Sequence, residues 1–190
     1  MDTLSIDQLN ELRLIIFDNA ESFYKEAKCL HENGFYARAY LSAYYTMEEL
    51  GKIPMIVGAL GKLVNNNEVD WKKLNKRFRT HAKKIESEVH HHYVFGIDPS
   101  PFNKDVEWYQ EKIKQVNEIY KKKNVSTYVD VTDGEIINPL KEISKDESKR
   151  VIEEAFDALK AHWASESISN KIIIPEQGAT DDRAPLGRSG

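Results

Sequence analysis

The chain of 190 residues is 41% hydrophobic and 31% charged, with 27 Lys and Arg against 31 Asp and Glu, so its formal net charge is -4. A chain of this length buries about 70% of its unfolded surface in one domain, so folding requires neither a metal nor a disulfide. Cys29 is the single cysteine, which excludes an internal disulfide framework and is typical of a reducing compartment. No segment approaches the ~20 apolar residues of a membrane span, and the N-terminal residues lack the pattern of a secretory signal. We therefore expect a cytoplasmic protein with no membrane segment.

The N-terminal region has the apolar period of one helix face, since apolar residues recur at three- and four-residue steps from residue 6 to 30. Ser5 and Gln8 have the spacing of a capping box at its start, and Asn33-Gly34 supplies a left-handed stop. A second periodic segment, residues 35–60, is apolar on two sides, which is typical of a central or interfacial helix. Pro54 lacks a backbone donor, so we expect a break in this segment near Lys52.

The third periodic run, from Leu74 to Val89, predicts a single helix with His81 in its apolar stripe, ended by Gly96. A fourth helix is predicted from Asp105 to Lys123. The β-rich segment that follows it, residues 124–130, is consistent with either an extended strand or one more helical turn.

Asp133-Gly134 predicts a turn, and the spacing of Ser144 and Glu147 predicts a capping box at the start of the last helix. Helical periods cover nearly all of the chain and no two strands are clearly paired. The sequence therefore predicts an all-α bundle of about five helices in one domain, residues 1–174, with a disordered tail at residues 175–190.

The basic residues are unevenly distributed. Residues 71–85 contain no acidic residue and hold seven basic ones: Lys72, Lys73, Lys76, Arg77, Arg79, Lys83 and Lys84. A second cluster is formed by residues 121–123, all lysine. If the third and fourth predicted helices, which carry these clusters, are neighbours, the clusters form one face that attracts phosphate despite the negative net charge. The alternative is a solvated face that acidic residues balance elsewhere.

His81 is the leading candidate for chemistry, because imidazole accepts and donates protons near neutral pH. Arg77 and Lys84 lie about one turn to either side, so on a continuous helix all three share a face. A phosphate held there suits cleavage of RNA by its own 2′-hydroxyl, with no metal. The alternative is a histidine hydrogen-bonded within the core.

The string YYTMEELGKIP contains Glu48, Glu49 and Lys52. Glu48 and Lys52 have the i,i+4 spacing of an ordinary ion pair. The same charges, with Arg38 and Tyr45, also predict a site or subunit contact on the face opposite the main apolar stripe.

We expect no metal and no cofactor. The three consecutive histidines of residues 90–92 point in different directions on a helix, whereas metal ligands converge. Glu88 and His91 have the Glu-x-x-His spacing of carboxylate di-iron bundles, but no second copy of that spacing occurs.

Three segments, in this order and spacing, resemble the AbiV family of abortive infection proteins: AYYTMEELGKIP at residues 43–54, RFRTHAKKI at 77–85 and KKKNVSTYVD at 121–130. The combination of EELGK with Phe78, His81 and Lys84 is the most distinctive part. This family resembles a branch of the HEPN superfamily, helical bundles that commonly dimerise and often act as metal-independent RNases in phage defence. The resemblance implies an up-and-down helical bundle, a homodimer, RNA as a target and a phage-encoded protein as a trigger.

The sequence departs from the catalytic HEPN pattern, in which an Arg precedes a His by slightly more than one helical turn. Arg77 and His81 are spaced a little too closely, and the segment in the matching place has Lys123 and Asn124, then Tyr128. Lysine keeps the charge of arginine but not its planar fork, and tyrosine is a poorer base than histidine at neutral pH.

A composite site is the arrangement we expect, with His81 as base and Arg77, Lys84 or Lys123 holding phosphate, and with Asp130 among the site or interface residues. RNA cleavage that arrests host translation or RNA metabolism is the first hypothesis. The competing hypothesis is a non-enzymatic module that binds RNA or a protein and blocks it stoichiometrically. A metal-binding bundle is the third.

Overall fold

A computed structural model describes residues 3–96 and 102–173 of the chain. The elements in this part are α1 (Ile6–Glu32), α2 (Tyr36–Leu50), α3 (Ile53–Val64), α4 (Trp71–Arg79), α5 (His81–Phe95), α6 (Phe102–Val125), β1 (Asp130–Thr132), β2 (Glu135–Ile137), α7 (Pro139–Glu142) and α8 (Lys145–Ile173). The prediction of an all-α bundle is confirmed. The expected disordered tail at 175–190 lies outside the described residues.

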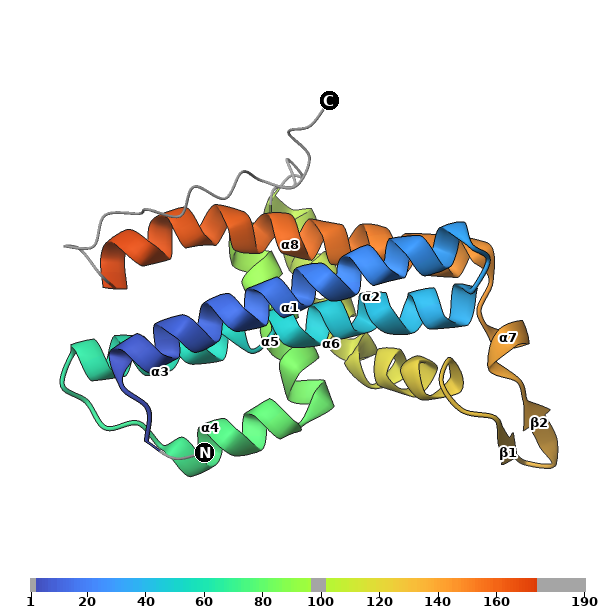
Figure 1. The fold of residues 1–190 in the computed structure, drawn as a ribbon, viewed down its shortest axis with the longest axis horizontal. Coiled ribbons are helices and arrows are strands. Elements are labelled where there is room, and N and C mark those ends of the chain that lie inside the picture. The colour runs from blue at the N-terminus through green and yellow to red at the C-terminus, as the bar shows by residue number, and fades with distance from the viewer. Residues whose placement is uncertain (1–2, 97–101, 174–190) are drawn as a thin grey trace.

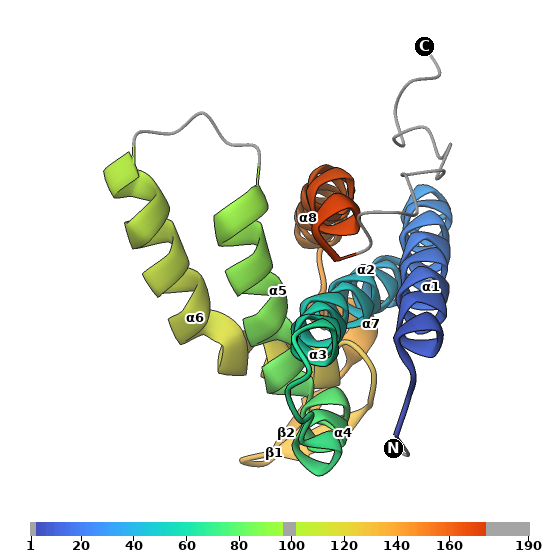
Figure 2. The same cartoon turned by 90° about the vertical axis from the view of Figure 1, so that its left-hand side faces the viewer.

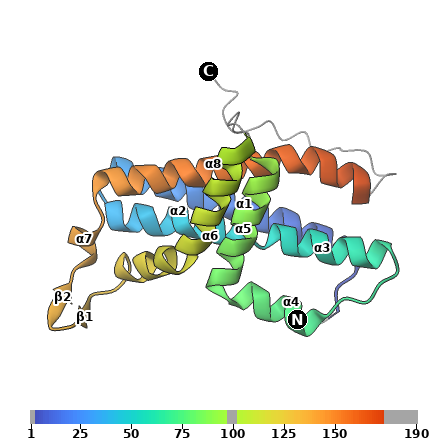
Figure 3. The same ribbon diagram turned by 180° about the vertical axis from the view of Figure 1, so that it is seen from behind.

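The long helices form two groups. α1, the α2–α3 pair and α8 run side by side along the long axis (Figure 1). α5 and α6 pack against each other and cross this group steeply, as the view from behind shows (Figure 3). The end-on view places α5 and α6 together on one side of α2 and α8, with α1 on the other side (Figure 2). α5 contacts both α2 and α8, so it joins the two groups.

The predicted caps of the first and last helices are confirmed. The Ser5 hydroxyl accepts a hydrogen bond from the Gln8 backbone (3.2 Å), and the Gln8 side chain accepts one from the Ser5 backbone (3.0 Å). Ser144 and Glu147 make the same reciprocal pair at the start of α8. α1 ends at Glu32 with Asn33 as its C-cap, and the following Gly34 has a φ of 81°, the left-handed conformation that stops a helix.

The second predicted helix is broken where Pro54 indicated. α2 ends at Leu50, and α3 begins at Ile53 with Pro54 in its first turn, where a missing N–H costs no internal hydrogen bond. The break keeps the direction of the chain, so α2 and α3 lie nearly in line (Figure 1).

The prediction of one helix from Leu74 to Val89 is wrong. The helix stops at Arg79, Thr80 takes an extended conformation (φ -96°, ψ 109°), and α5 begins at His81. The Thr80 hydroxyl donates to the carbonyl of Lys76, which occupies an acceptor of the preceding turn. His81 therefore lies in the first turn of a new helix. This split, the break after α2 and the short α7 explain why the described residues form more than the five helices expected.

Residues 130–137 form a small hairpin, which contradicts the expectation that no strands pair. Val131 pairs with Ile136 across the antiparallel ladder. The predicted turn at Asp133-Gly134 is confirmed, with φ of 52° and 84°, the positive values that a tight hairpin turn requires.

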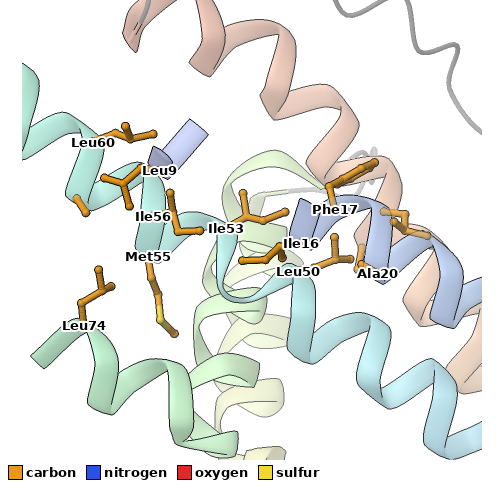
Figure 4. Packing of buried hydrophobic residues seen from close by; sticks show 13 residues of the cluster. Leu9, Ile16, Phe17, Ala20, Leu50, Ile53, Met55, Ile56, Leu60 and Leu74 are labelled. Carbon is orange, nitrogen blue, oxygen red and sulfur yellow. The ribbon is translucent and has the colours of Figure 1, made fainter. Parts of the chain in front are cut away.

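The largest apolar cluster lies where α1, the α2–α3 junction and α8 meet. Leu9, Ile16 and Phe17 of α1 pack against Leu50, Ile53 and Ile56 (Figure 4). A separate cluster between α2, α5 and α6 contains Tyr44, Ile85, Val89 and Val116. No helix in the described part of the chain is long and apolar enough to cross a membrane.

Candidate functional site

A buried acid, a lysine and a histidine meet where α2 faces the first turn of α5. The Glu48 side chain is only 4% exposed, and its Oε1 lies 2.5 Å from Nδ1 of His81. Its other carboxylate oxygen, Oε2, accepts from the Nζ of the buried Lys84. The carboxylate thus holds both residues through separate oxygens. We refer to Glu48, His81 and Lys84 as the triad.

The balance of charge in the triad keeps Glu48 ionised. Burial raises the pKa of the Glu48 carboxyl, but the hydrogen bond and charge of Lys84, followed by those of His81, outweigh burial, so the pKa lies below its ordinary value. Burial, and then the negative charge of Glu48, raises the pKa of the adjacent Tyr44 hydroxyl, which therefore stays protonated.

The ionised carboxylate fixes the tautomer of His81. A carboxylate only accepts hydrogen bonds, so Nδ1 of His81 carries the proton that it donates to Glu48. In the neutral imidazole, Nε2 then holds the free lone pair. Since 39% of the His81 side chain is exposed, the imidazole is open to solvent. An oriented, accessible imidazole backed by a carboxylate is the arrangement of a general base.

Aromatic rings connect the triad to the lysine cluster of α6. The His81 ring stacks on Tyr120, with centroids 5.4 Å apart and planes at 25°. The Nζ of Lys123 lies over two tyrosine rings, 5.6 Å from the Tyr120 centroid and 5.8 Å from the Tyr45 centroid. The buried Lys123 and the His81 imidazole thus both contact the Tyr120 ring.

Gly51 of the EELGK string permits the close approach of α2 and α5. A Cβ at this position would lie 2.0 Å from the backbone oxygen of Lys84, well inside van der Waals contact. The backbones of the two helices therefore touch here, which brings Lys84 within reach of Glu48.

The remaining predicted residues lie elsewhere. Arg77 does not share a helix face with His81, because the helix ends at Arg79. It is exposed and lines a cavity with Pro54 and His90 that includes no member of the triad. Arg77 and His81 are close in the sequence, but because of the break at Thr80 they lie on different helices.

The predicted ion pair between Glu48 and Lys52 does not form. Lys52 pairs with Glu49 instead, because α2 ends before a full turn follows Glu48 and because Glu48 points toward α5. Glu49 and Lys52 are half-buried, and within the described part of the chain neither forms a hydrogen bond or ion pair with the triad.

The segment after α6 lies near the site without joining the triad. The Asn124 carbonyl accepts from the backbone of Thr127 and Tyr128 and so caps α6. Arg38 of α2 donates to the carbonyl of Thr127 (3.2 Å). Tyr128 is 65% exposed and adds to the raised pKa of Tyr45, after burial and Glu48. The carboxylate of Asp130 accepts from the next backbone N–H, so it serves the hairpin.

Tyr120 had no predicted role in the site. Its signal was the helical period of α6, which placed Tyr120 on the face that packs against α5 but gave no reason to pair it with His81. The sequence paired Glu48 with Lys52 rather than with Lys84, because the spacing within one helix carries no information about a partner 36 residues away.

The fold and site together define a helical bundle in which a buried acid pairs with a buried lysine and orients a partly exposed histidine. The model of the AbiV family, a HEPN-type family, matches residues 8–160. The chain therefore belongs to the AbiV family of HEPN-type abortive infection proteins, as the resemblance implied. No curated protein and no solved structure matches the chain.

Proposed function

We propose that this protein is a cytoplasmic phage-defence protein that cleaves RNA without a catalytic metal and so arrests host translation or RNA metabolism. The observation that carries the proposal is the Glu48–His81 contact, which leaves Nε2 of an accessible imidazole free to take a proton. In the reaction, Nε2 removes the proton of a ribose 2′-hydroxyl, whose oxygen attacks the adjacent phosphorus. The 5′-oxygen of the next nucleotide leaves and takes a proton from water, and the products are a 2′,3′-cyclic phosphate and a 5′-hydroxyl.

Two groups of cations support RNA as the substrate. Lys123 contacts the Tyr120 ring on which His81 stacks; it is buried, so to hold the phosphate undergoing attack, as this proposal has it, its side chain must turn outward. The exposed cations of α4 extend the positive surface on the other side of His81: Lys72, Lys73, Lys76, Arg77 and Arg79. Such a surface raises the rate and affinity of RNA binding, and salt reduces both.

An RNA-cleavage assay tests the proposal. Labelled RNA incubated with the purified chain in excess chelator is expected to be cleaved, and His81→Ala is expected to slow cleavage by at least ~100-fold because the general base is lost. His90→Ala is the matched control, since His90 is an exposed histidine on the same helix whose hydrogen-bond partners, the Glu86 carbonyl and the Tyr109 hydroxyl, lie outside the triad. Tyr128→Phe is expected to keep nearly full activity, because Tyr128 lies outside the triad.

Intact RNA in the wild-type reaction contradicts cleavage. It would favour the second candidate, a module that binds RNA or a protein and blocks it stoichiometrically. A specific observation favours that candidate: Lys123 and Tyr128 stand where catalytic HEPN proteins carry Arg and His. In that case the wild type binds RNA with a steep salt dependence and Lys123→Met weakens the binding.

We also propose that the chain forms a homodimer and responds to a phage-encoded trigger protein. The support for a dimer is an exposed apolar surface around the hairpin, formed by Tyr128, Val129, Val131, Ile136 and Leu140, each at least 65% exposed. Sedimentation of the wild type is expected to give twice the chain mass of 21.9 kDa. Ile136→Lys is expected to give a monomer. Val64→Lys, which changes an exposed apolar residue far from the hairpin in the sequence, is expected to leave the dimer intact. A wild-type monomer at micromolar concentration contradicts this prediction.

A further inference from the structure

A second cluster of titratable side chains lies between α5 and α8, outside the triad. Glu88 and His91 are one turn apart on α5, and His162 faces them from α8. All three are buried, with exposed fractions of 4%, 7% and 1%. One ligand-forming atom from each lies within 4.8 Å of the others. Three side chains of types that bind metals, from two helices, therefore meet in the interior.

The hydrogen bonds within this cluster leave half of its polar atoms unused. Glu88 Oε2 lies 2.7 Å from His162 Nε2, and His91 Nε2 lies 2.9 Å from the hydroxyl of Ser165. The two imidazole rings stack, with centroids 3.6 Å apart and planes at 11°. Glu88 Oε1, His91 Nδ1 and His162 Nδ1 are buried without a hydrogen-bond partner among the described residues. A buried polar atom that is left unpaired destabilises the folded state.

We infer that Glu88, His91 and His162 form a binding site for a divalent transition-metal ion of the zinc type. Two imidazole nitrogens and one carboxylate oxygen are a donor set that zinc takes in proteins, with a water in the fourth position. Three atoms within 4.8 Å of one another share a point about 2.8 Å or less from each, and zinc bonds are about 2.0–2.2 Å long, so small side-chain rotations complete the site.

The surroundings of the cluster suit a metal. A cavity of about 150 Å³ on one side is lined by Glu88 and Asp157. A second cavity, of about 350 Å³, is lined by His91 and Phe95 on the other side. The site is therefore reachable from the surface without unfolding.

The position of the site assigns the metal a structural role. α5 carries His81 and Lys84 in its first turn and Glu88 and His91 one to two turns further on. A metal bound by Glu88, His91 and His162 ties this helix to α8 and so stabilises the platform of the triad. The inference is independent of the proposed RNA cleavage, in which the metal takes no step.

A titration of the full chain with Co²⁺ and Zn²⁺, after treatment with a chelator and its removal, tests the site. The wild type is expected to bind one Co²⁺ with visible absorption bands that Zn²⁺ displaces, and one equivalent of Zn²⁺ is expected to raise the melting temperature. His91→Gln is expected to weaken Co²⁺ binding by at least ~10-fold, because a direct ligand contributes at least as much as an outer-shell partner.

Two further variants separate the site from other causes. His90→Gln is the matched control, because it removes an exposed histidine of the same run and is expected to keep both responses. Glu88→Gln keeps the shape of the side chain, and a circular-dichroism spectrum checks that it folds. A folded Glu88→Gln or His91→Gln protein that binds Co²⁺ as tightly as the wild type overturns the inference. So does the absence of Co²⁺ uptake by the wild type, or the loss of uptake in His90→Gln alone.

Discussion

Replacing Glu48 with alanine is expected to lower the free energy of unfolding by about 3–5 kcal/mol, because it leaves the buried ammonium of Lys84 without its partner. The same change removes the group that orients His81. Urea unfolding followed by circular dichroism measures the loss.

Glu49→Ala is the matched control for this prediction. Glu49 is the next residue on the same helix, and its partner Lys52 is partly exposed, so the loss is expected to stay below about 1 kcal/mol. The double variant Glu48→Leu with Lys84→Met is expected to recover most of the stability of Glu48→Ala, because it leaves no buried charge unpaired. Equal losses for Glu48→Ala and Glu49→Ala contradict the burial of the triad.

The triad also predicts a pH dependence. The folded-state pKa of Glu48 lies below its ordinary value, so its ionised form stabilises the folded state above the pKa of the unfolded chain. This contribution is lost as the pH falls below about 4.5 toward the lower folded-state pKa. The difference in unfolding free energy between the wild type and Glu48→Gln is therefore expected to shrink between pH 6 and pH 3. A constant difference across this range contradicts an ionised Glu48.

Gly51→Ala is expected to destabilise the protein by about 3 kcal/mol, because the added Cβ would lie 2.0 Å from the carbonyl oxygen of Lys84. That oxygen belongs to the backbone of α5, so relief requires the two helices to move apart. The movement also weakens the contact between Glu48 and Lys84, and His81→Ala and Gly51→Ala are expected to impair RNA cleavage alike.

The control for this prediction is Gly58→Ala in α3. No heavy atom lies within 4 Å of a Cβ at Gly58, so alanine there is expected to stabilise the helix by up to about 1 kcal/mol. Thermal melts of the two variants compare them directly. A melting temperature for Gly51→Ala at or above that of the wild type would mean that α2 and α5 do not touch at this glycine.

Local sequence signals predicted the ends of helices well. The capping boxes at Ser5 and Ser144, the stop at Gly34 and the break before Pro54 are all where the residues indicated, because each depends on side chains within four positions. Apolar periodicity also predicted the all-α class. It did not predict the break at Thr80, since the apolar spacing continues through that residue, whereas the helix ends on the extended backbone of Thr80 and the hydrogen bond from its hydroxyl to the Lys76 carbonyl.

Composition and residue pattern alone determined the helical class, the family motifs and His81 as the leading candidate. Only the tertiary structure decided what His81 contacts. Glu48 and Tyr120 reach it from two other helices, and His162 of α8 bonds Glu88 across 74 residues of chain and stacks on His91. The physical reason is range: capping and periodicity act over one or two turns, whereas a site is formed by the packing of helices that are remote in sequence. The net charge of -4 illustrates the same limit, because only the fold sets Lys123 of α6 against the tyrosine ring on which His81 stacks.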